Sequence, residues 1–261
     1  MFILLFESYC IMTDSKFKIK KPKNWKNLEF HEKIQYFMSV ITKDYSQYVD
    51  KLQAKILAKN MCNEINIAKV IKILDNPHDI NDQDINIDYI IKSVHASRWN
   101  INITNKNIAK ENIINKLEKF NRQYNPTTEL QYSHITPRFF IEEKIDDIYV
   151  GKNGMAFSYN FYCLYGKIQC IRVDNPRIKV VNMYDINWQL IGDDNMKLDI
   201  KKPDNYDDII TCVNKLCAPF EFVRIDLFLA KNNMIYFSEF TFTPNGGAKF
   251  ITPIIFVDEW D

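Results

Sequence analysis

The sequence predicts an α+β protein in which two lobes face each other across a cleft, after a short helical region near the N-terminus. Two observations carry this prediction. Amphipathic helical segments come first along the 261 residues, and β-branched and aromatic runs, broken by single helices, follow them. Runs of strands with segregated helices are typical of α+β architecture. We expect an extension at 1–26, a helical and α/β region at 27–80, a small lobe at 81–146 and a large antiparallel β lobe at 147–261.

The bulk composition excludes several classes of protein. Charged residues make up 26% of the chain and its formal net charge is +1, so we expect no nucleic-acid partner. No apolar run reaches the ~18 residues that span a bilayer. Six Cys without a C-x-x-C pair, and only four His, argue against a zinc site. They indicate reduced, mostly buried thiols of an intracellular protein, which we expect to be cytoplasmic.

The N-terminal segment is apolar but does not have the features of a signal peptide. Glu7 interrupts the run Met1–Phe6, which has no basic residues before it and no small-residue cleavage site after it. We therefore expect a buried or disordered extension, with Met12 as an alternative start. The basic, proline-containing segment Lys16–Lys26 is aperiodic and is expected to be a surface arm.

Periodicity places the helices and strands. Apolar residues at helical spacing predict helices at Phe30–Ile41, Tyr48–Asn60, Asn107–Tyr124 and Tyr206–Leu216. Strands are expected at Ile65–Leu74, Tyr89–Val94 and Pro137–Ile145, and one or two short strands within Val180–Leu190. Ala156–Leu164 and Ile168–Val173, joined by a turn at Gly166, predict a hairpin.

A second hairpin, near the C-terminus, carries the clearest candidate site. Strands at Phe222–Leu229 and Met234–Thr241 are joined by a polar turn and followed by a Pro-Gly loop. Asp226 and Glu239 lie on adjacent strands, and Mg²⁺ is usually held by one or two carboxylates plus phosphates. Arg224, two residues before Asp226, lies on the same face and suits developing negative charge. The alternatives are two exposed acids on a solvated face, with Arg224 as a salt-bridge partner of Glu239.

Other charged residues upstream are ambiguous by themselves. Lys92 interrupts an apolar strand, so it must find a partner such as phosphate, or face water on an edge strand. Lys51 has the pattern of an ordinary helix-surface lysine. Glu142, Glu143, Lys144 and Ile145 end a strand where a linker between lobes is expected, and they are either adenine contacts or a charged strand end. Neither a Walker-type loop nor a G-x-G-x-x-G is present, so a nucleotide site must have another architecture.

Taken together, these segments resemble the ATP-grasp superfamily, and most closely its TupA-like family of polysaccharide and teichuronopeptide gene clusters. The resemblance runs from about Asn27 to the C-terminus. The segments that carry it are Leu28–Tyr36, Asp50–Lys55, Ile90–Ser97, Pro137–Ile145, Ser158–Lys167, Phe222–Asp226 and Glu239–Pro244. The hairpin and the Asp-Lys-x-x-x-Lys helix are also similar to D-alanine–D-alanine ligases. The resemblance implies an ATP-grasp fold whose two α+β lobes grip ATP between them.

The resemblance also implies a role for each candidate residue. Lys51, Lys92 and Ser97 would contact the phosphates, and Glu142–Ile145 would form the hinge that holds adenine. Asp226, Glu239 and Thr241 would bind Mg²⁺. Arg224 and Lys92 would assist the transfer. Ala96 and Arg98 stand where the family's phosphate-covering flap usually has glycine, Asn160 replaces a usual lysine, and Thr241 replaces the superfamily's Asn.

The activity that the resemblance implies is an ATP- and Mg²⁺-dependent carboxylate–amine ligase acting through an acyl phosphate. Its partners would be a small-molecule or glycan substrate with a carboxylate and an amine, in surface-polysaccharide modification. An ATP-grasp kinase or phosphotransferase, and an inactive binding module, are the alternatives. Products distinguish them, because a ligase yields ADP, phosphate and an amide, whereas a kinase leaves phosphate on the acceptor.

Overall fold

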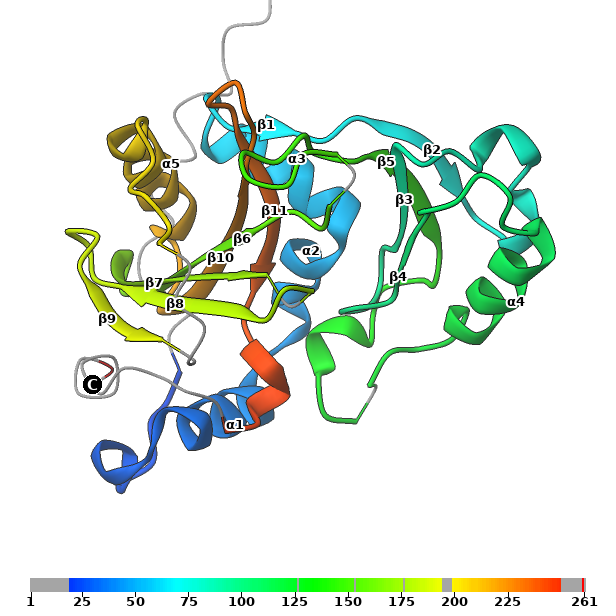
Figure 1. Ribbon diagram of the computed structural model, residues 1–261. Helices are drawn as coiled ribbons and strands as arrows, with labels where there is room; N and C mark the ends of the chain where they lie inside the picture. The colour runs from blue at the N-terminus through cyan, green and yellow to red at the C-terminus, as the bar shows by residue number, and fades with distance from the viewer. Residues whose placement is uncertain are drawn as a thin grey trace, which may run out of the picture.

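A computed structural model describes residues 19–125, 127–152, 154–175, 177–193, 199–249 and 260. Its strands form two sheets, of seven strands in the order β1-β11-β10-β6-β7-β8-β9 and of four in the order β2-β5-β3-β4 (Figure 1). The large sheet comprises β1 (Asn66–Ile67), β6 (Ser158–Leu164), β7 (Lys167–Asn175), β8 (Val180–Tyr184), β9 (Leu190–Asp193), β10 (Phe222–Leu229) and β11 (Ile235–Thr241). The small sheet comprises β2 (Val70–Leu74), β3 (Tyr89–Ser93), β4 (Asn100–Asn102) and β5 (Phe139–Glu143). The predicted α+β class is confirmed.

The helices lie around these sheets. The α-helices are α1 (Phe30–Val40), α2 (Ser46–Val49), α3 (Lys51–Met61), α4 (Lys110–Phe120) and α5 (Tyr206–Cys217). Short 3₁₀ helices are η1 (Trp25–Asn27), η2 (Lys43–Tyr45), η3 (Pro77–Asp79), η4 (Asp82–Asp84), η5 (Leu130–Tyr132) and η6 (Pro244–Gly247). The predicted helices are therefore confirmed, with ends that differ by a few residues. One difference is larger, because Asp50 interrupts the predicted helix Tyr48–Asn60 and caps α3 instead.

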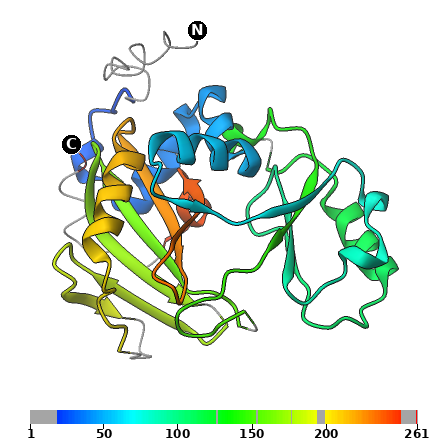
Figure 2. The ribbon, with the colours of Figure 1, turned by 90° about the horizontal axis from the view of Figure 1, so that it is seen from above.

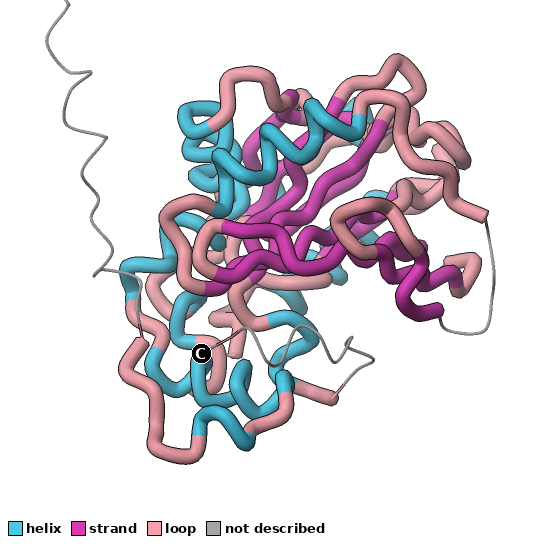
Figure 3. The backbone as a smooth tube through the Cα atoms, turned by 90° about the vertical axis from the view of Figure 1, so that its left-hand side faces the viewer, coloured by secondary structure: helices cyan, strands magenta, loops and turns pink. Residues whose placement is uncertain are grey.

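The large sheet has one face packed against helices and one face that carries polar residues. Val223, Ile225 and Leu227 of β10 are fully buried, whereas Arg224 points to the opposite face. α3 and α2 contact β11, and α5 contacts β10, β6 and β7. Figure 3 shows helices lying beside the strands. Burying each large aliphatic side chain contributes about 1.5–3 kcal/mol, so this packing fixes which face of β10 carries Arg224.

The small sheet is arranged in the same way. Ile91 and Ile141 pack with Leu117 of α4 in a separate apolar cluster on its outer side (Figure 2). Because side chains alternate along a strand, Lys92 and Glu142 lie on the other face. Phe140, which is the cross-strand neighbour of Lys92, belongs to the core of the large sheet. This face of the small sheet is therefore turned toward the large sheet.

Two chain segments connect the sheets side by side. β1 leads into β2 through Ala68 and Lys69, and β5 leads back through Lys144–Asp147 (Figure 2). The Glu143 amide donates to the Lys69 carbonyl at 3.0 Å, and the Lys231 amide donates to the Asp146 carbonyl at 3.0 Å. The β10–β11 turn is thus attached directly to the second connection.

The N-terminal side of the described chain is packed more closely than expected. Trp25 is 3% exposed, and its ring contacts Trp260 at 5.1 Å between centroids. The prediction of a surface arm is therefore wrong around Trp25, because a large aromatic ring gains more by burial than a basic neighbourhood gains by solvation. α1 then covers one end of the polar face of the large sheet, where Phe30 and Phe37 pack on Phe222. Met1–Phe6, Met12 and the first part of the expected arm lie outside the described residues.

The cysteines of the described part of the chain are buried thiols. Cys62, Cys163, Cys170, Cys212 and Cys217 are all buried and free, as expected, and Cys10 lies outside this part. Within the described ranges, no helix combines the length and the apolar character needed to cross a bilayer.

Candidate active site

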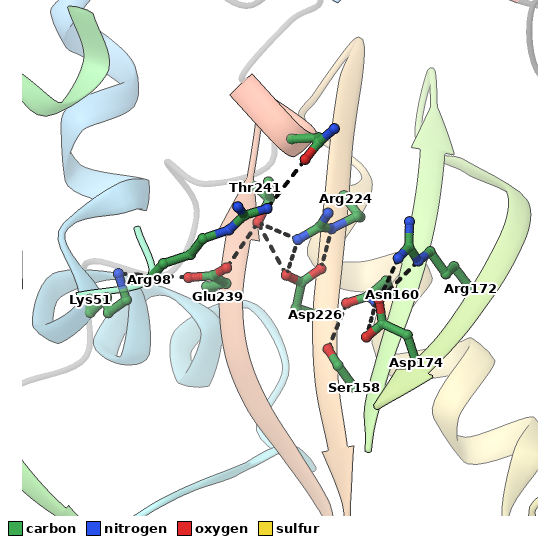
Figure 4. Close-up of polar contacts among 11 residues, drawn as sticks. Lys51, Arg98, Ser158, Asn160, Arg172, Asp174, Arg224, Asp226, Glu239 and Thr241 are labelled. Atoms are coloured by element: carbon green, nitrogen blue, oxygen red, sulfur yellow. Dashed lines mark hydrogen bonds and ion pairs between the residues drawn. The ribbon is translucent and has the colours of Figure 1, made fainter. Parts of the chain in front are cut away.

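The β10–β11 hairpin brings the predicted metal ligands together. Arg224 faces Thr241 and Asp226 faces Glu239 across the two antiparallel strands. Arg224 donates from Nε to Asp226 Oδ1 and from Nη2 to Asp226 Oδ2, both at 2.6 Å. Thr241 Oγ1 lies 3.2 Å from Asp226 Oδ2 and 3.3 Å from Glu239 Oε1 (Figure 4). Three oxygens therefore converge beside the guanidinium, and the alternative that pairs Arg224 with Glu239 is wrong, because Arg224 pairs with Asp226.

The two carboxylates have different electrostatic environments. Burial raises the pKa of Asp226 to about 7, although the Arg224 guanidinium opposes this shift. Burial also acts to raise the pKa of Glu239, but the charges of Lys51, Arg224 and Lys92 outweigh it and lower that pKa below its ordinary value. Glu239 is therefore ionised at neutral pH, and Asp226 is a carboxyl group whose charged form gains from a further nearby cation.

Lys51 reaches this hairpin from α3. The Asp50 carboxylate caps the helix by accepting from the amides of Leu52 and Gln53 at 3.0 and 2.9 Å. Lys51 Nζ lies 3.7 Å from Glu239 Oε2 and donates to the Ala96 carbonyl. Burial lowers the pKa of Lys51. Its side chain is only 8% exposed, so the interpretation of Lys51 as a helix-surface lysine is wrong.

Lys92 approaches the hairpin from the small sheet. It lies on β3, which pairs with β4 and β5 on its two sides, so the edge-strand alternative is wrong. Its ammonium forms an ion pair with Glu142, whose other oxygen lies 2.9 Å from Lys55 Nζ. Lys55 was missed as a site residue, although it lies four residues after Lys51 and therefore on the same helix face. This buried Lys55–Glu142–Lys92 cluster connects α3 to the small sheet.

Two loops meet near Thr241 at one end of the hairpin. Arg98 Nη2 donates to Asn245 Oδ1 at 3.2 Å, which joins the predicted flap to the loop that follows β11. Arg98 has φ +62°, a left-handed conformation that glycine adopts without a steric cost. The backbone therefore keeps the shape that glycine favours, with an arginine in its place. Ser97 is partly exposed beside Arg98, and its side chain acts to lower the pKa of Tyr124 against the larger effect of burial.

A cavity of about 290 Å³ lies at the opposite end of the hairpin, where the two connections meet the β10–β11 turn. Three of the predicted hinge residues line it, and Glu142 lies instead in the buried ion cluster. The lining residues are Ile67, Ala68, Lys69, Glu143, Lys144, Ile145, Asp146, Lys152, Ala230, Lys231, Asn232 and Tyr236. The Lys144 ammonium donates to the carbonyls of Ile87 and Ile103 at 2.5 and 2.6 Å, which fixes this connection against the small lobe.

The apolar surface between the cavity and the carboxylates was also missed from the sequence. Phe228 is the cross-strand neighbour of Tyr236, and Lys92 Nζ lies 5.8 Å from the Phe228 ring centroid. Phe228 is two residues from Asp226, so strand alternation alone would have placed both on one face. Going away from the cavity, this face of the hairpin therefore carries the Phe228 ring, then the carboxylates of Asp226 and Glu239, and then the Arg224 guanidinium.

The donor set fits a hard divalent cation that is shared with phosphate. No group of three or more His, Cys, Asp and Glu suited to a metal occurs among the described residues. Asp226, Glu239 and the Thr241 hydroxyl offer oxygen ligands only, and Mg²⁺ is commonly held by one or two carboxylates with phosphate oxygens completing its shell. Lys51 and Lys92 lie close enough to add positive charge where those oxygens would be.

The two sheets, the two connections between them and the Arg-x-Asp and Glu-x-Thr strands agree with the family match, which makes this an ATP-grasp protein. The chain belongs to the TupA-like ATP-grasp family, whose profile matches residues 32–260. A search of curated proteins gives no significant match.

The solved structures that match this chain include ligases and a synthetase, all of low sequence identity. An L-amino acid ligase from Bacillus licheniformis has 13% identity and a TM-score of 0.48 over 77% of this chain and 44% of its own. The ATP-grasp ligase PsnB, complexed with a precursor variant, Mg and ADP, has 11% identity and a TM-score of 0.46 over 83% of this chain and 58% of its own. D-alanyl-alanine synthetase A from Vibrio cholerae has 14% identity and a TM-score of 0.44 over 80% of this chain and 57% of its own. The chain thus spans about half the length of these enzymes.

Proposed function

We propose that the protein is an ATP- and Mg²⁺-dependent carboxylate–amine ligase. One observation carries the proposal, which is the approach of Lys51 on α3 and Lys92 on the small sheet to the hairpin that holds Asp226 and Glu239. Positive groups from one side and oxygen ligands from the other suit a polyphosphate bridged to Mg²⁺. Family membership supports ATP as the bound nucleotide, because the family match covers both sheets and the connections between them.

The nucleotide would lie along the hairpin. Adenine would occupy the hinge cavity beside Glu143, Lys144 and Ile145, with Phe228 against its inner edge. The phosphates would contact Lys51, Lys92 and the flap at Ser97. Lys92 would then exchange Glu142 for a phosphate oxygen, while Lys55 keeps Glu142 in place.

The chemistry follows from the same arrangement. Asp226, Glu239 and Thr241 would hold Mg²⁺, and bound Mg²⁺–ATP would supply an electrophilic γ-phosphorus. A substrate carboxylate oxygen forms a bond to that phosphorus and ADP leaves, giving an acyl phosphate. The amine nitrogen then bonds to the acyl carbon, inorganic phosphate leaves and the nitrogen loses a proton. Arg224 would stabilise the charge on the transferred group, and the protein acts mainly by positioning and electrostatics.

We extend the proposal to the substrates through the family resemblance. The carboxylate or amine would belong to an amino acid or amino sugar that is joined to a surface glycan. A kinase acting on a hydroxyl would use the same phosphate site, so product identity distinguishes the two reactions.

The test measures ADP release and the trapping of an activated acyl group. Candidate acids are incubated with the protein, Mg²⁺–ATP and hydroxylamine, and ADP and hydroxamate are quantified. We expect ADP and hydroxamate in equal amounts with a cognate acid. Phosphate retained on the acceptor would identify a kinase instead. Saturating Mg²⁺–ATP should also stabilise the fold by about 2–4 kcal/mol, and no stabilisation would contradict both reactions.

A further inference from the structure

The polar face of the large sheet continues beyond the proposed metal site. Asp226 on β10 faces Asn160 on β6, and Asn160 faces Arg172 on β7. Neighbouring strands are about 4.8 Å apart, so the Cα of Arg172 lies roughly 10 Å from that of Asp226, on the same face. Figure 4 shows these side chains projecting from adjacent strands beside the Arg224–Asp226 pair.

A connected cluster of polar groups occupies this extension. Arg172 contacts Asp174 Oδ2 through both Nε and Nη2 at 2.9 Å. The Asn160 amide donates to Asp174 Oδ1 at 3.4 Å, and Ser158 Oγ donates to Asn160 Oδ1 at 2.7 Å. The side chains of Arg172 and Asp174 are 24% and 20% exposed, compared with 5% for Asp226. The cluster is therefore anchored at the buried Asn160, and its charged groups remain accessible.

The extension lies to one side of the proposed nucleotide. The hinge cavity and Phe228 lie along β10 from Asp226, whereas Arg172 lies across the sheet from it. A nucleotide placed along the hairpin leaves the surface over β6 and β7 for the carboxylate substrate. The Arg172 cluster and the proposed metal site also interact electrostatically, since the charge of Asp174 is among the causes that raise the pKa of Asp226.

We propose that Arg172 and its neighbours Asn160 and Asp174 form the subsite for a second anionic group on the carboxylate substrate. The inference rests on the proposed ligase function. One carboxylate of the substrate would lie beside Arg224 for phosphorylation, and the second anionic group would pair with Arg172. A planar guanidinium offers donors in a geometry that matches a carboxylate, and Asp174 fixes the plane of the Arg172 guanidinium through Nε and Nη2. Arg172 lies two strand spacings from Asp226, roughly 10 Å between Cα atoms, and this span favours a dicarboxylic acid of about four to seven carbons.

The neighbouring carboxylate provides a matched control. Asp174 competes with a bound anion for the same guanidinium, so Asp174→Asn should leave anion binding intact or strengthen it. Arg172→Gln should remove it. A purely structural ion pair predicts that the two variants behave alike, because either substitution breaks the pair.

The experiment compares glutarate with pentanoate, which has the same number of carbons and one carboxylate. Binding to the protein saturated with Mg²⁺ and a non-hydrolysable ATP analogue is measured by calorimetry. Wild type should bind glutarate at least about tenfold more tightly, the difference expected from one charge-assisted pair. Arg172→Gln should remove this preference, and Asp174→Asn should retain it. Equal binding of the two acids, binding of neither, or loss of the preference in both variants would overturn the proposal.

A hydroxamate assay with the same two acids separates this subsite from the ligase reaction. A glutarate preference in binding without any hydroxamate would contradict the ligase and leave the subsite standing. Hydroxamate formed equally well from both acids would support the ligase and overturn the subsite.

Discussion

Glu142→Gln is expected to destabilise the nucleotide-free protein strongly. The substitution removes the negative charge that Lys55 and Lys92 share, at side-chain exposures of 6%, 12% and 4% for Lys55, Lys92 and Glu142. At 2.9 Å and an effective dielectric constant of 20, the Lys55 pair alone has an attraction of about 6 kcal/mol before desolvation is subtracted. Breaking a buried pair by removing one partner costs about 3–5 kcal/mol, because the remaining charge is left uncompensated. We therefore expect about 4 kcal/mol, or roughly a 10 °C fall in Tm.

Urea and thermal unfolding at pH 7.5 would measure this loss. Burial acts to raise the pKa of Glu142, but the charges of Lys92 and Lys55 lower it to about 2. The stabilisation is therefore fully present above the ordinary Glu pKa and is lost as the pH falls through the folded value, so neutral pH is suitable. Glu143→Gln is the control, since Glu143 is 42% exposed beside Lys69 at 3.6 Å and should cost under about 0.5 kcal/mol.

A double variant tests the cause of the loss. Adding Lys55→Met to Glu142→Gln removes one uncompensated charge and should restore part of the lost stability. A Glu142→Gln protein that unfolds within about 1 kcal/mol of wild type would refute the reasoning, because a buried cluster of two lysines cannot lose its counter-charge at so small a cost.

Further predictions concern Lys51 and the segment that carries His95 and Arg98. Lys51→Ala should weaken Mg²⁺–ATP binding at least about tenfold in calorimetry, because a buried charge-assisted contact to phosphate is lost; unchanged affinity would contradict its assignment. Arg98→Val should be less stable than Arg98→Gly by about 1–2 kcal/mol in urea unfolding, since a β-branched residue resists φ +62°; equal midpoints would contradict a left-handed flap. Burial lowers the pKa of His95, so the unfolded chain binds the proton more readily and stability should fall as pH drops from 7 to 5. The slope of Tm against pH should be shallower in His95→Gln, and equal slopes would contradict a neutral buried His95.

Local patterns in the sequence predict much of the fold. The β10–β11 hairpin forms where alternation and the polar turn place it, and Asp226 and Glu239 become cross-strand neighbours. α5 follows its 3.6-residue periodicity because one apolar face packs on β10 and β6. These elements depend on contacts close in the sequence or on burial of one face, and a single sequence records both.

The remaining features depend on contacts between distant segments. Lys55 finds Glu142 only because α3 lies against the small sheet, and nothing in the helix pattern distinguishes Lys55 from a solvated lysine. Trp25 is buried by Trp260, which lies at the other end of the chain. The position of Arg172 beside Asp226 requires the registers of both β6 and β7, and a slip of one residue would turn Arg172 to the opposite face.

The proposed reaction depends on Asp226 and Glu239 holding Mg²⁺ against the phosphates of ATP. The most direct measurement is the affinity for ATP with Mg²⁺ and with EDTA, by calorimetry, in wild type, Asp226→Asn and Glu239→Gln. We predict that Mg²⁺ strengthens binding in wild type, that both variants lose most of this gain, and that both unfold cooperatively like wild type. Variants that bind Mg²⁺–ATP as tightly as wild type would contradict the metal site and, with it, the proposed reaction.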